Sequence, residues 1–321
     1  MTYKNRLTFL LSLIGVLALA YIANIIFTSN IFGFGSSSYA WIDSKSAPKI
    51  SKIAFSAADQ EYELVRKNNR WFVLHDGFEY PARQTRIDDL LDILSKRADY
   101  PVRTSSVSAH QRFGTGENAS KAAFHGDFSI ILDLILGDDD VLKSETYYRR
   151  AGQNEVRSGT SSIKSYFTGS ANSWYNLRLV PDSEGSAGAA DIANVQRVSV
   201  FIDNQTQIFT RKNRGWEISG INVANPSITN IETYIRSILN TEGDNFADSS
   251  LKDDPIFGNN HITIEFGNAR ITTIRLSEAD ETGRIFAYVS GASFAGGDFV
   301  YSIPSWAASR FYRDASSFET Q

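Results

Sequence analysis

The chain has no cysteine among its 321 residues. Disulfide bonds, thiolate metal sites, a cysteine nucleophile and a lipid-modified cysteine are therefore excluded, and stability has to come from packing. Basic charge is also scarce, because 32 Lys and Arg face 36 Asp and Glu and the net charge is −4. Proteins that bind nucleic acid usually cluster Lys and Arg against the phosphates. We therefore predict no nucleic-acid partner.

Motifs that signal catalysis or cofactor binding are missing as well. The sequence has no phosphate-binding loop and no Gly-x-Gly-x-x-Gly, and its glycine-rich stretch Gly291–Gly296 is one residue too long for a serine nucleophile elbow. The four histidines are scattered, and none falls opposite another when the two halves of the chain are aligned: His75, His110, His125 and His261. We predict no catalytic residues, no cofactor and no metal, hence a non-enzymatic protein.

One long apolar run stands at the N-terminus. Leu7–Phe27 contains 21 residues without a charge and follows Lys4 and Arg6. A helix of this length, at about 1.5 Å per residue, crosses a hydrocarbon core of about 30 Å. The positive-inside rule then leaves residues 1–6 in the cytoplasm. We predict a single-pass anchor in the cytoplasmic (inner) membrane with an extracytoplasmic or periplasmic C-terminal region; the alternative is a signal peptide cleaved after Ala20.

A juxtamembrane linker is predicted over residues 28–47, which are rich in Gly and Ser. Its aromatic residues suit a lipid interface: Phe32, Phe34, Tyr39 and Trp41. From residue 48 the spacing of apolar residues changes to that of half-buried strands. Tyr62 to Leu64 and Trp71 to Val73, joined by Lys67–Asn69, predict a β-hairpin.

A helix is predicted next, over Thr85–Arg97, because its apolar residues recur at i, i+3, i+4 and i+7. Phe128–Leu136 and Thr146–Arg150 then predict a second antiparallel pair, joined through the hydrophilic turn Gly137–Asp140.

The same order of features returns in the second half of the chain. A shift of 145 residues, and then of 144, brings 13 identical residues into register. Arg66, Lys67 and Trp71 meet Arg211, Lys212 and Trp216, and Phe113-Gly114 meets Phe257-Gly258. We predict an α+β fold: the transmembrane helix followed by two tandem copies of an antiparallel-sheet-plus-helix unit, residues 48–180 and 194–321, joined by a linker at 181–193.

The two halves differ in charge. Residues 44–180 hold 19 basic against 17 acidic residues, a net of +2, whereas residues 181–321 hold 11 against 18, a net of −7. Two interpretations stand: ordinary solvation, or an acidic face that meets a basic partner.

The repeated basic and aromatic residues are the one candidate site: Arg66, Lys67, Trp71, Arg211, Lys212 and Trp216. In a structural account they form a hairpin turn and a core tryptophan, and in a binding account they form exposed patches for an anionic glycan or a protein.

Asp138–Asp140 predicts a solvated turn, since it lacks the spacing of a calcium loop. His125 and Asp127 lack a third zinc ligand.

The succession of motifs resembles the family called domain of unknown function 4340. The motifs are Arg66–Val73, Pro81–Leu94, Phe113-Gly114, Leu132–Gly137, Tyr147–Arg150 and Val156–Ser158. The resemblance is closer in the first unit, because the second has no Tyr-x-Arg pair after its strand. It implies a membrane-anchored companion of gliding-motility-type ABC transport systems, with a permease or a larger auxiliary envelope protein as partner.

Two functions are therefore expected. The first is a non-enzymatic accessory protein that interacts with an ABC-type transport system. The alternative is an envelope enzyme or a module that binds cell-wall glycan, with a pocket made from several of His125, Asp127, Arg149 and Glu155.

Overall fold

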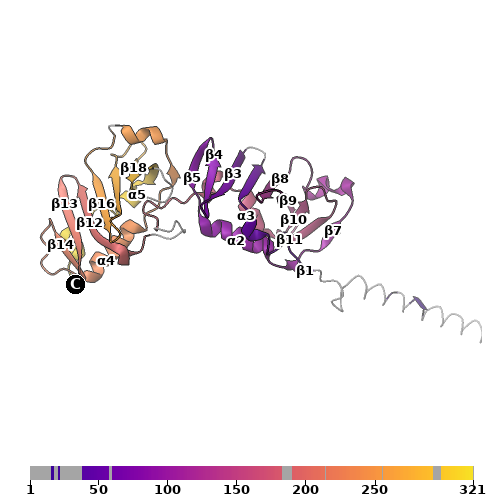
Figure 1. Cartoon of the computed structure of the whole chain (residues 1–321), viewed down its shortest axis with the longest axis horizontal. Coiled ribbons are helices and arrows are strands. Elements are labelled where there is room, and N and C mark those ends of the chain that lie inside the picture. Colours follow the sequence, from indigo (N-terminus) through magenta and orange to yellow (C-terminus); the bar gives the residue numbers. More distant parts are fainter. Residues whose placement is uncertain are drawn as a thin grey trace, which may run out of the picture.

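The computed structural model describes residues 16–17, 21, 38–57, 60–182, 190–213, 215–254, 256–291 and 298–320. Figure 1 shows two bodies side by side along the chain. We call residues 38–176 the first unit and residues 177–320 the second unit. Each is built on one large antiparallel sheet.

The sheets have closely related strand orders. In space the first sheet runs β5 (Phe78–Pro81), β4 (Arg70–His75), β3 (Gln60–Lys67), β2 (Lys52–Ala57), β8 (Ser120–His125), β9 (Ile130–Asp139), β10 (Glu145–Arg150), β11 (Val156–Thr160) and β7 (Val102–Thr104). The second runs β14 (Gly215–Ser219), β13 (Gln205–Lys212), β12 (Val195–Ile202), β16 (His261–Phe266), β17 (Ile271–Leu276), β18 (Arg284–Ser290), β19 (Phe299–Pro304) and β15 (Asn245–Phe246). From β4 and β14 onward both follow the chain in the same succession, and β5 is extra. A third, small sheet pairs β1 (Ser38–Tyr39) with β6 (Ala98–Asp99).

One helix of 12 residues belongs to each unit, α2 (Gln84–Ser95) and α4 (Ile228–Leu239). Apart from these two and the helical residues Val16, Leu17 and Tyr21, the helices of the described residues are single turns. They are α3 (Lys164–Phe167), α5 (Ser305–Ala308) and the 3₁₀ turns η1 (Ala47–Lys49), η2 (Val107–Ala109), η3 (Gln111–Phe113), η4 (Ser161–Ile163), η5 (Ala171–Trp174), η6 (Ile192–Asn194), η7 (Ser249–Asp253) and η8 (Ala315–Phe318).

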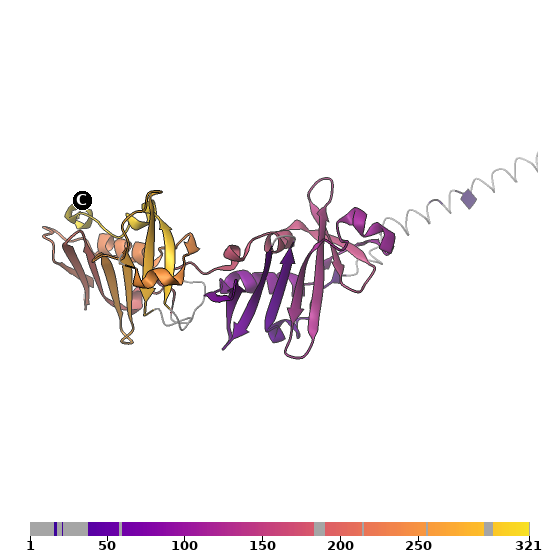
Figure 2. The same ribbon diagram turned by 90° about the horizontal axis from the view of Figure 1, so that it is seen from above.

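The core of each unit lies between the sheet and these helices, as Figure 2 shows from above. In β2 the alternate residues Ile53 and Phe55 are buried, as expected for a strand with one face toward a core. On α2 the buried residues are Ile87, Leu90 and Leu94, which form the apolar stripe predicted from the sequence. The predicted helix and the hairpin of β3 and β4 are thereby confirmed.

The predicted α+β fold class is wrong. Strands hold 42% of the described residues, in three sheets, so the described chain is mostly antiparallel β-structure with few helices. The apolar stripe over Thr85–Arg97 correctly predicts a helix, but one such helix in each unit covers only part of a long sheet. The remaining cover comes from short turns whose side chains, such as Trp174, leave no helical period in the sequence.

The predicted transmembrane helix requires a correction too. Of residues 7–27, only Val16, Leu17 and Tyr21 are among those described, so most of the predicted span lies outside them. Within the described ranges, no helix combines the length and the apolar character that a membrane crossing needs. Val16, Leu17 and Tyr21 are helical, but three residues are too few to establish a span of about 20 residues. We therefore withdraw the membrane anchor and the inner-membrane localisation based on it.

The segment predicted as a juxtamembrane linker is described from Ser38 onward, and there it belongs to the first unit. Trp41 and Ile42 are 2% and 1% exposed, and the Trp41 ring lies 5.5 Å from Tyr100 and 5.9 Å from Tyr148. These aromatic rings pack in the core rather than at a lipid surface. The unit thus begins before residue 48. The predicted linker 181–193 lies outside the described residues between 183 and 189.

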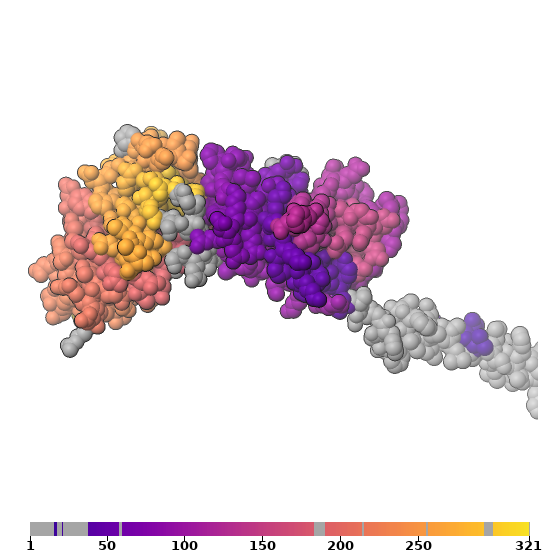
Figure 3. All heavy atoms as spheres, viewed as in Figure 1, coloured from indigo at the N-terminus to yellow at the C-terminus, as the bar shows by residue number. Residues whose placement is uncertain are grey.

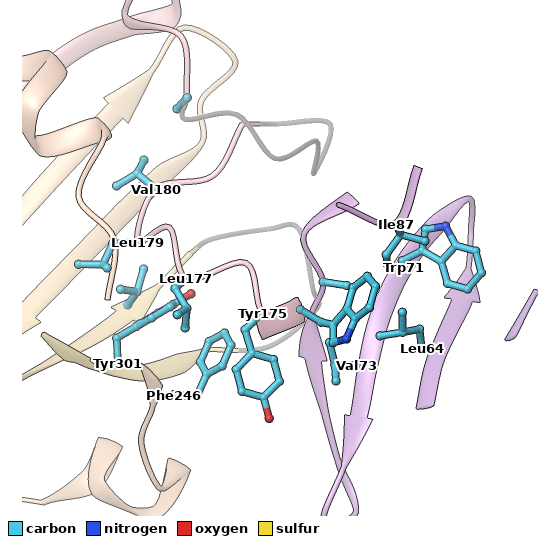
Figure 4. Packing of buried hydrophobic residues seen from close by; sticks show 14 of the residues in the cluster. Leu64, Trp71, Val73, Ile87, Tyr175, Leu177, Leu179, Val180, Phe246 and Tyr301 are labelled. Carbon is cyan, nitrogen blue, oxygen red and sulfur yellow. The ribbon is translucent and has the colours of Figure 1, made fainter. Parts of the chain in front are cut away.

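A short segment after Tyr175 joins the two units and is hydrogen-bonded to both. The Asn176 N–H donates to the carbonyl oxygen of Pro81 in the first unit, at 2.8 Å. One residue later the carbonyl oxygen of Leu177 accepts from Gly243, and Leu179 donates to Thr241, both in the second unit. Figure 4 shows this passage. The described passage between the units is therefore hydrogen-bonded at both of its ends.

Four aromatic side chains pack together where the two units meet. Tyr80 of β5 stacks on Phe246 of β15, with ring centroids 4.8 Å apart. Tyr175 lies 4.9 Å from Tyr80 and 5.2 Å from Phe246, and Phe299 lies 5.2 Å from Phe246. We call these four residues the aromatic joint. Pairs of this kind contribute about 0.5–1.5 kcal/mol each beyond their buried area, so the joint couples the units.

Phe246→Ala is expected to uncouple the units. The substitution removes the ring that the other three residues of the joint share, so the free energy of unfolding should fall by about 3 kcal/mol. Differential scanning calorimetry should then show two transitions in place of one. Phe201→Ala is the control, because Phe201 stacks on His261 away from the joint. A single transition in the Phe246 variant would contradict the coupling.

Candidate functional site

The repeated basic and aromatic residues occupy equivalent places in the two sheets. Arg66 on β3 is the direct cross-strand neighbour of Trp71 on β4. Arg211 on β13 has the same relation to Trp216 on β14. In the first unit Asn68 and Asn69 make the turn with φ of 50° and 64°, the left-handed values that a two-residue hairpin requires. The sequence repeat is therefore a repeat of one hairpin.

Both tryptophans are buried, with Trp71 3% and Trp216 6% exposed. The guanidinium carbon of Arg211 lies 4.6 Å from the centroid of Trp216, and that of Arg66 lies 5.9 Å from Trp71. The indole rings therefore have no free face that a glycan or a partner protein could contact. This placement supports the structural account of the motif.

Each arginine also binds the backbone at or just before the start of the neighbouring long strand, β2 or β12. Arg66 donates to the carbonyl oxygen of Pro48 at 3.1 Å. Arg211 donates to the carbonyl oxygens of Val195 and Ile192, at 2.8 and 2.6 Å. A guanidinium group offers five donors in a rigid plane, so it can stack on the ring and bond the backbone together.

The two lysines of the motif remain at the surface. Lys67 pairs with Glu79, and Lys212 lies 3.4 Å from Glu217. Exposed pairs of this kind contribute about 0–1 kcal/mol, so the lysines do not hold the hairpins together.

The aspartate run has a structural role that differs from the predicted free turn. Asp138 and Asp139 belong to β9, and only Asp140 lies in the turn to β10. The Asp140 carboxylate accepts from the backbone N–H of Ser144 and of Glu145, at 2.7 and 2.9 Å. These hydrogen bonds, that from Glu145 above all, hold the pKa of Asp140 below its usual range. Its neighbour Asp139 binds Lys164 at 2.7 Å.

The residues of the expected enzymatic pocket do not converge. Arg149 lies level with Lys121 across the sheet, whereas His125 is four residues further along β8 and two strands away. That separation is about 13 Å along the strands and about 10 Å across them. Arg149 donates to the carbonyl oxygen of Thr115, and Glu155 pairs with Arg157. These groups are occupied separately.

Metal ligands do not gather in the described ranges either, where no three His, Asp or Glu side chains stand close enough to hold an ion. A shallow hollow of about 420 Å³ lies over the solvent face of the first sheet. Two of its charged or polar groups have partners: Glu63 binds Lys52 at 2.9 Å, and His75 contacts the Tyr175 hydroxyl at 3.2 Å.

An exposed apolar tip is the feature that sequence reasoning missed. Val141 and Leu142, in the turn between β9 and β10, are 99% and 83% exposed. Asp140 fixes this turn from one side, and Lys143 completes it with φ of 55°. We call Val141 and Leu142 the hairpin tip. The available signal was a pair of hydrocarbon side chains inside a stretch that is otherwise polar.

Trp71→Ala is expected to lower the free energy of unfolding by about 3–5 kcal/mol, as for other large core aromatics. The loss should appear in urea unfolding followed by circular dichroism, and Lys67→Ala, at the exposed end of the same strand pair, should change stability by less than about 0.5 kcal/mol. A loss below about 1 kcal/mol for Trp71→Ala would contradict the structural account.

The turn of the hairpin tip is expected to loosen in acid. Because folding lowers the pKa of Asp140 from 3.8, its ionised form stabilises the turn above that pH, and this contribution is lost as the pH falls through the lower folded value. The amide resonances of Ser144 and Glu145 should therefore shift with a midpoint below 3.8. Asp140→Asn should abolish that titration, whereas Asp138→Asn should keep it. A midpoint at or above the ordinary value would contradict the assignment.

Comparison of the chain with known protein families, curated proteins and solved structures found no match. The resemblance to the domain of unknown function 4340 therefore stays a prediction.

Proposed function

We propose that this chain is a non-enzymatic accessory protein that binds a partner protein through the hairpin tip. The observation that carries the proposal is the nearly complete exposure of Val141 and Leu142 on a turn that is held in one conformation. Burial of each side chain at an interface is worth about 1.5–3 kcal/mol.

The tip is held in place before it binds. Asp140 closes the turn with hydrogen bonds from Ser144 and Glu145, and Asp139 ties the same hairpin to Lys164 of α3. Ordering of loops and side chains is a major cost of association, so a preformed turn keeps more of its binding free energy.

The shape of the tip favours a protein partner over a small ligand. Small molecules bind in concave pockets that cover most of their surface, whereas Val141 and Leu142 project outward from the end of two strands. Side chains that project in this way fit a groove in another protein. Three aspartates precede the tip and Asp139 is paired with Lys164, so the charges of Asp138 and Asp140 would complement a groove with a basic rim.

The first partner to test follows from the sequence resemblance alone. It points to a permease or a larger auxiliary envelope subunit of an ABC-type transport system. In this proposal ATP hydrolysis belongs to the transport system, and the chain contributes binding.

Removal of the hairpin tip is expected to release the partner. The double variant Val141→Ser with Leu142→Ser should weaken binding about a hundredfold, since it removes roughly 3 kcal/mol of apolar burial. Its stability should change by less than about 0.5 kcal/mol, because both side chains are exposed. Affinity purification of the tagged full chain, followed by a Kd measurement with the purified partner, checks both.

Val107→Ser is the matched control, because Val107 is an exposed hydrocarbon side chain of the same unit, at 62% exposure, outside the tip. It should retain the partner. Retention by the double variant, or turnover of a cell-wall substrate by the purified chain alone, would contradict the proposal.

A further inference from the structure

The second sheet has a free edge where the first sheet has an additional strand. In the first unit β5 lies along the outer side of β4. In the second unit β14 pairs only with β13 among the described residues, and it ends the sheet. Figure 1 shows β14 at the end of the second unit that points away from the first, and Figure 3 shows the same end as a surface.

Backbone groups of β14 point outward along this edge. In the first unit the N–H and C=O of Trp71 face outward, where Gln84 binds both, at 2.9 and 3.0 Å. Trp216 has the equivalent place opposite Arg211, so its backbone groups face outward as well. Orientation alternates along a strand, so those of Ile218 also face outward.

The missing strand follows from turn chemistry and not from chain length. The same number of residues separates Trp71 from Pro81 and Trp216 from Pro226. In the first unit Asp76 and Gly77, with φ of 51° and 79°, fold β5 back onto β4. The sequence repeat sets Ile221 and Asn222 at these positions, which lack the Asp-Gly pair that favours such a turn. The segment after β14 is instead bonded to residues near position 320, where the carbonyl oxygen of Asn225 accepts from the Thr320 N–H at 2.9 Å.

We propose that this edge binds an extended, basic segment of a partner protein, which adds to β14 as β5 adds to β4. Strand addition of this kind gains affinity from backbone hydrogen bonds and specificity from alternate side chains. Tyr80 pairs with Val73, and the repeat places Ile218 there, so an aromatic residue is expected opposite Ile218. Pro81 pairs with Phe72, and the repeat places Glu217 where the first unit has Phe72. The residue of the added segment that corresponds to Pro81 is therefore expected opposite Glu217.

Charge supports a basic segment. The side chain of Glu217 is 64% exposed and lies 3.4 Å from Lys212, an exposed pair whose carboxylate stays open to solvent on the side of the added strand; the region 181–321 carries 18 acidic against 11 basic residues. An opposite charge directly across a strand pair stabilises the pairing, and a like charge opposes it.

The same charge opposes a second copy of the chain as occupant. In a two-fold symmetric pair of β14 strands, the outward backbone groups of Trp216 in one copy would bond those of Ile218 in the other. Glu217 would then lie opposite Glu217 of the second copy. A head-to-tail contact that copies the joint is also incomplete. The repeat places Asn225 where the first unit has Tyr80, so the ring that stacks on Phe246 is missing there.

Two synthetic peptides test the edge on the full chain. Both have the sequence of His75–Ala82 with Asp76→Asn and Glu79→Gln, and one carries Pro81→Lys and the other Pro81→Glu, which places either charge opposite Glu217. The lysine peptide should bind about fivefold more tightly at low salt. Glu217→Lys, a change at an exposed side chain, should reverse that order. Isothermal titration calorimetry gives the affinities, and hydrogen exchange should show the Trp216 and Ile218 amides protected only in the complex.

Ile218→Pro removes one outward N–H and should weaken both peptides by at least about tenfold, whereas Ile218→Ala should keep the preference for lysine. Equal affinities of the two peptides in the unsubstituted chain, or protection of both amides in the free chain, would overturn the proposal. Sedimentation that shows a dimer abolished by Ile218→Pro would identify a second copy as the occupant and overturn it too. None of these outcomes bears on the hairpin tip.

Discussion

An antiparallel sheet leaves a row of unpaired backbone groups along each edge, and the organisation of this chain depends on how those rows are covered. In the first unit β5 covers β4, and the ring of Tyr80 on β5 then becomes the surface on which the second unit docks. One strand thus completes a sheet and also fixes the neighbouring unit. The second unit keeps the same topology without that strand, so among the described residues its outer strand β14 is paired on one side only.

Local signals in the sequence predict local structure well. The helix over Gln84–Ser95 follows from its apolar stripe, and the hairpin around Asn68 and Asn69 follows from turn chemistry. The fold class does not follow from these local signals. Most strands here are short, with alternating buried and exposed residues, and segments far along the chain cover their buried faces. The place of Trp41 is decided in the same way by rings of Tyr100 and Tyr148, which are far along the chain.

The sequence left two accounts of the candidate site open, a structural one and a binding one. A basic residue near a tryptophan has the same composition whether the ring is buried or exposed, and only tertiary packing decides between these states. Arg211 is an example of such packing, because its guanidinium covers the ring of Trp216 and also binds the backbone of Val195. Val141 and Leu142 show the converse, because hydrocarbon side chains in sequence predict burial and the structure exposes them.

The short passage from Tyr175 to Leu179 has a mechanical consequence. Its backbone is bonded first to Pro81 and then to Gly243 and Thr241, so no residue between the units is left to act as a swivel. The two units therefore keep a fixed spacing. A partner can contact surfaces on both units at once only if its own binding sites have the same spacing, and a force applied to one unit is transmitted to the other.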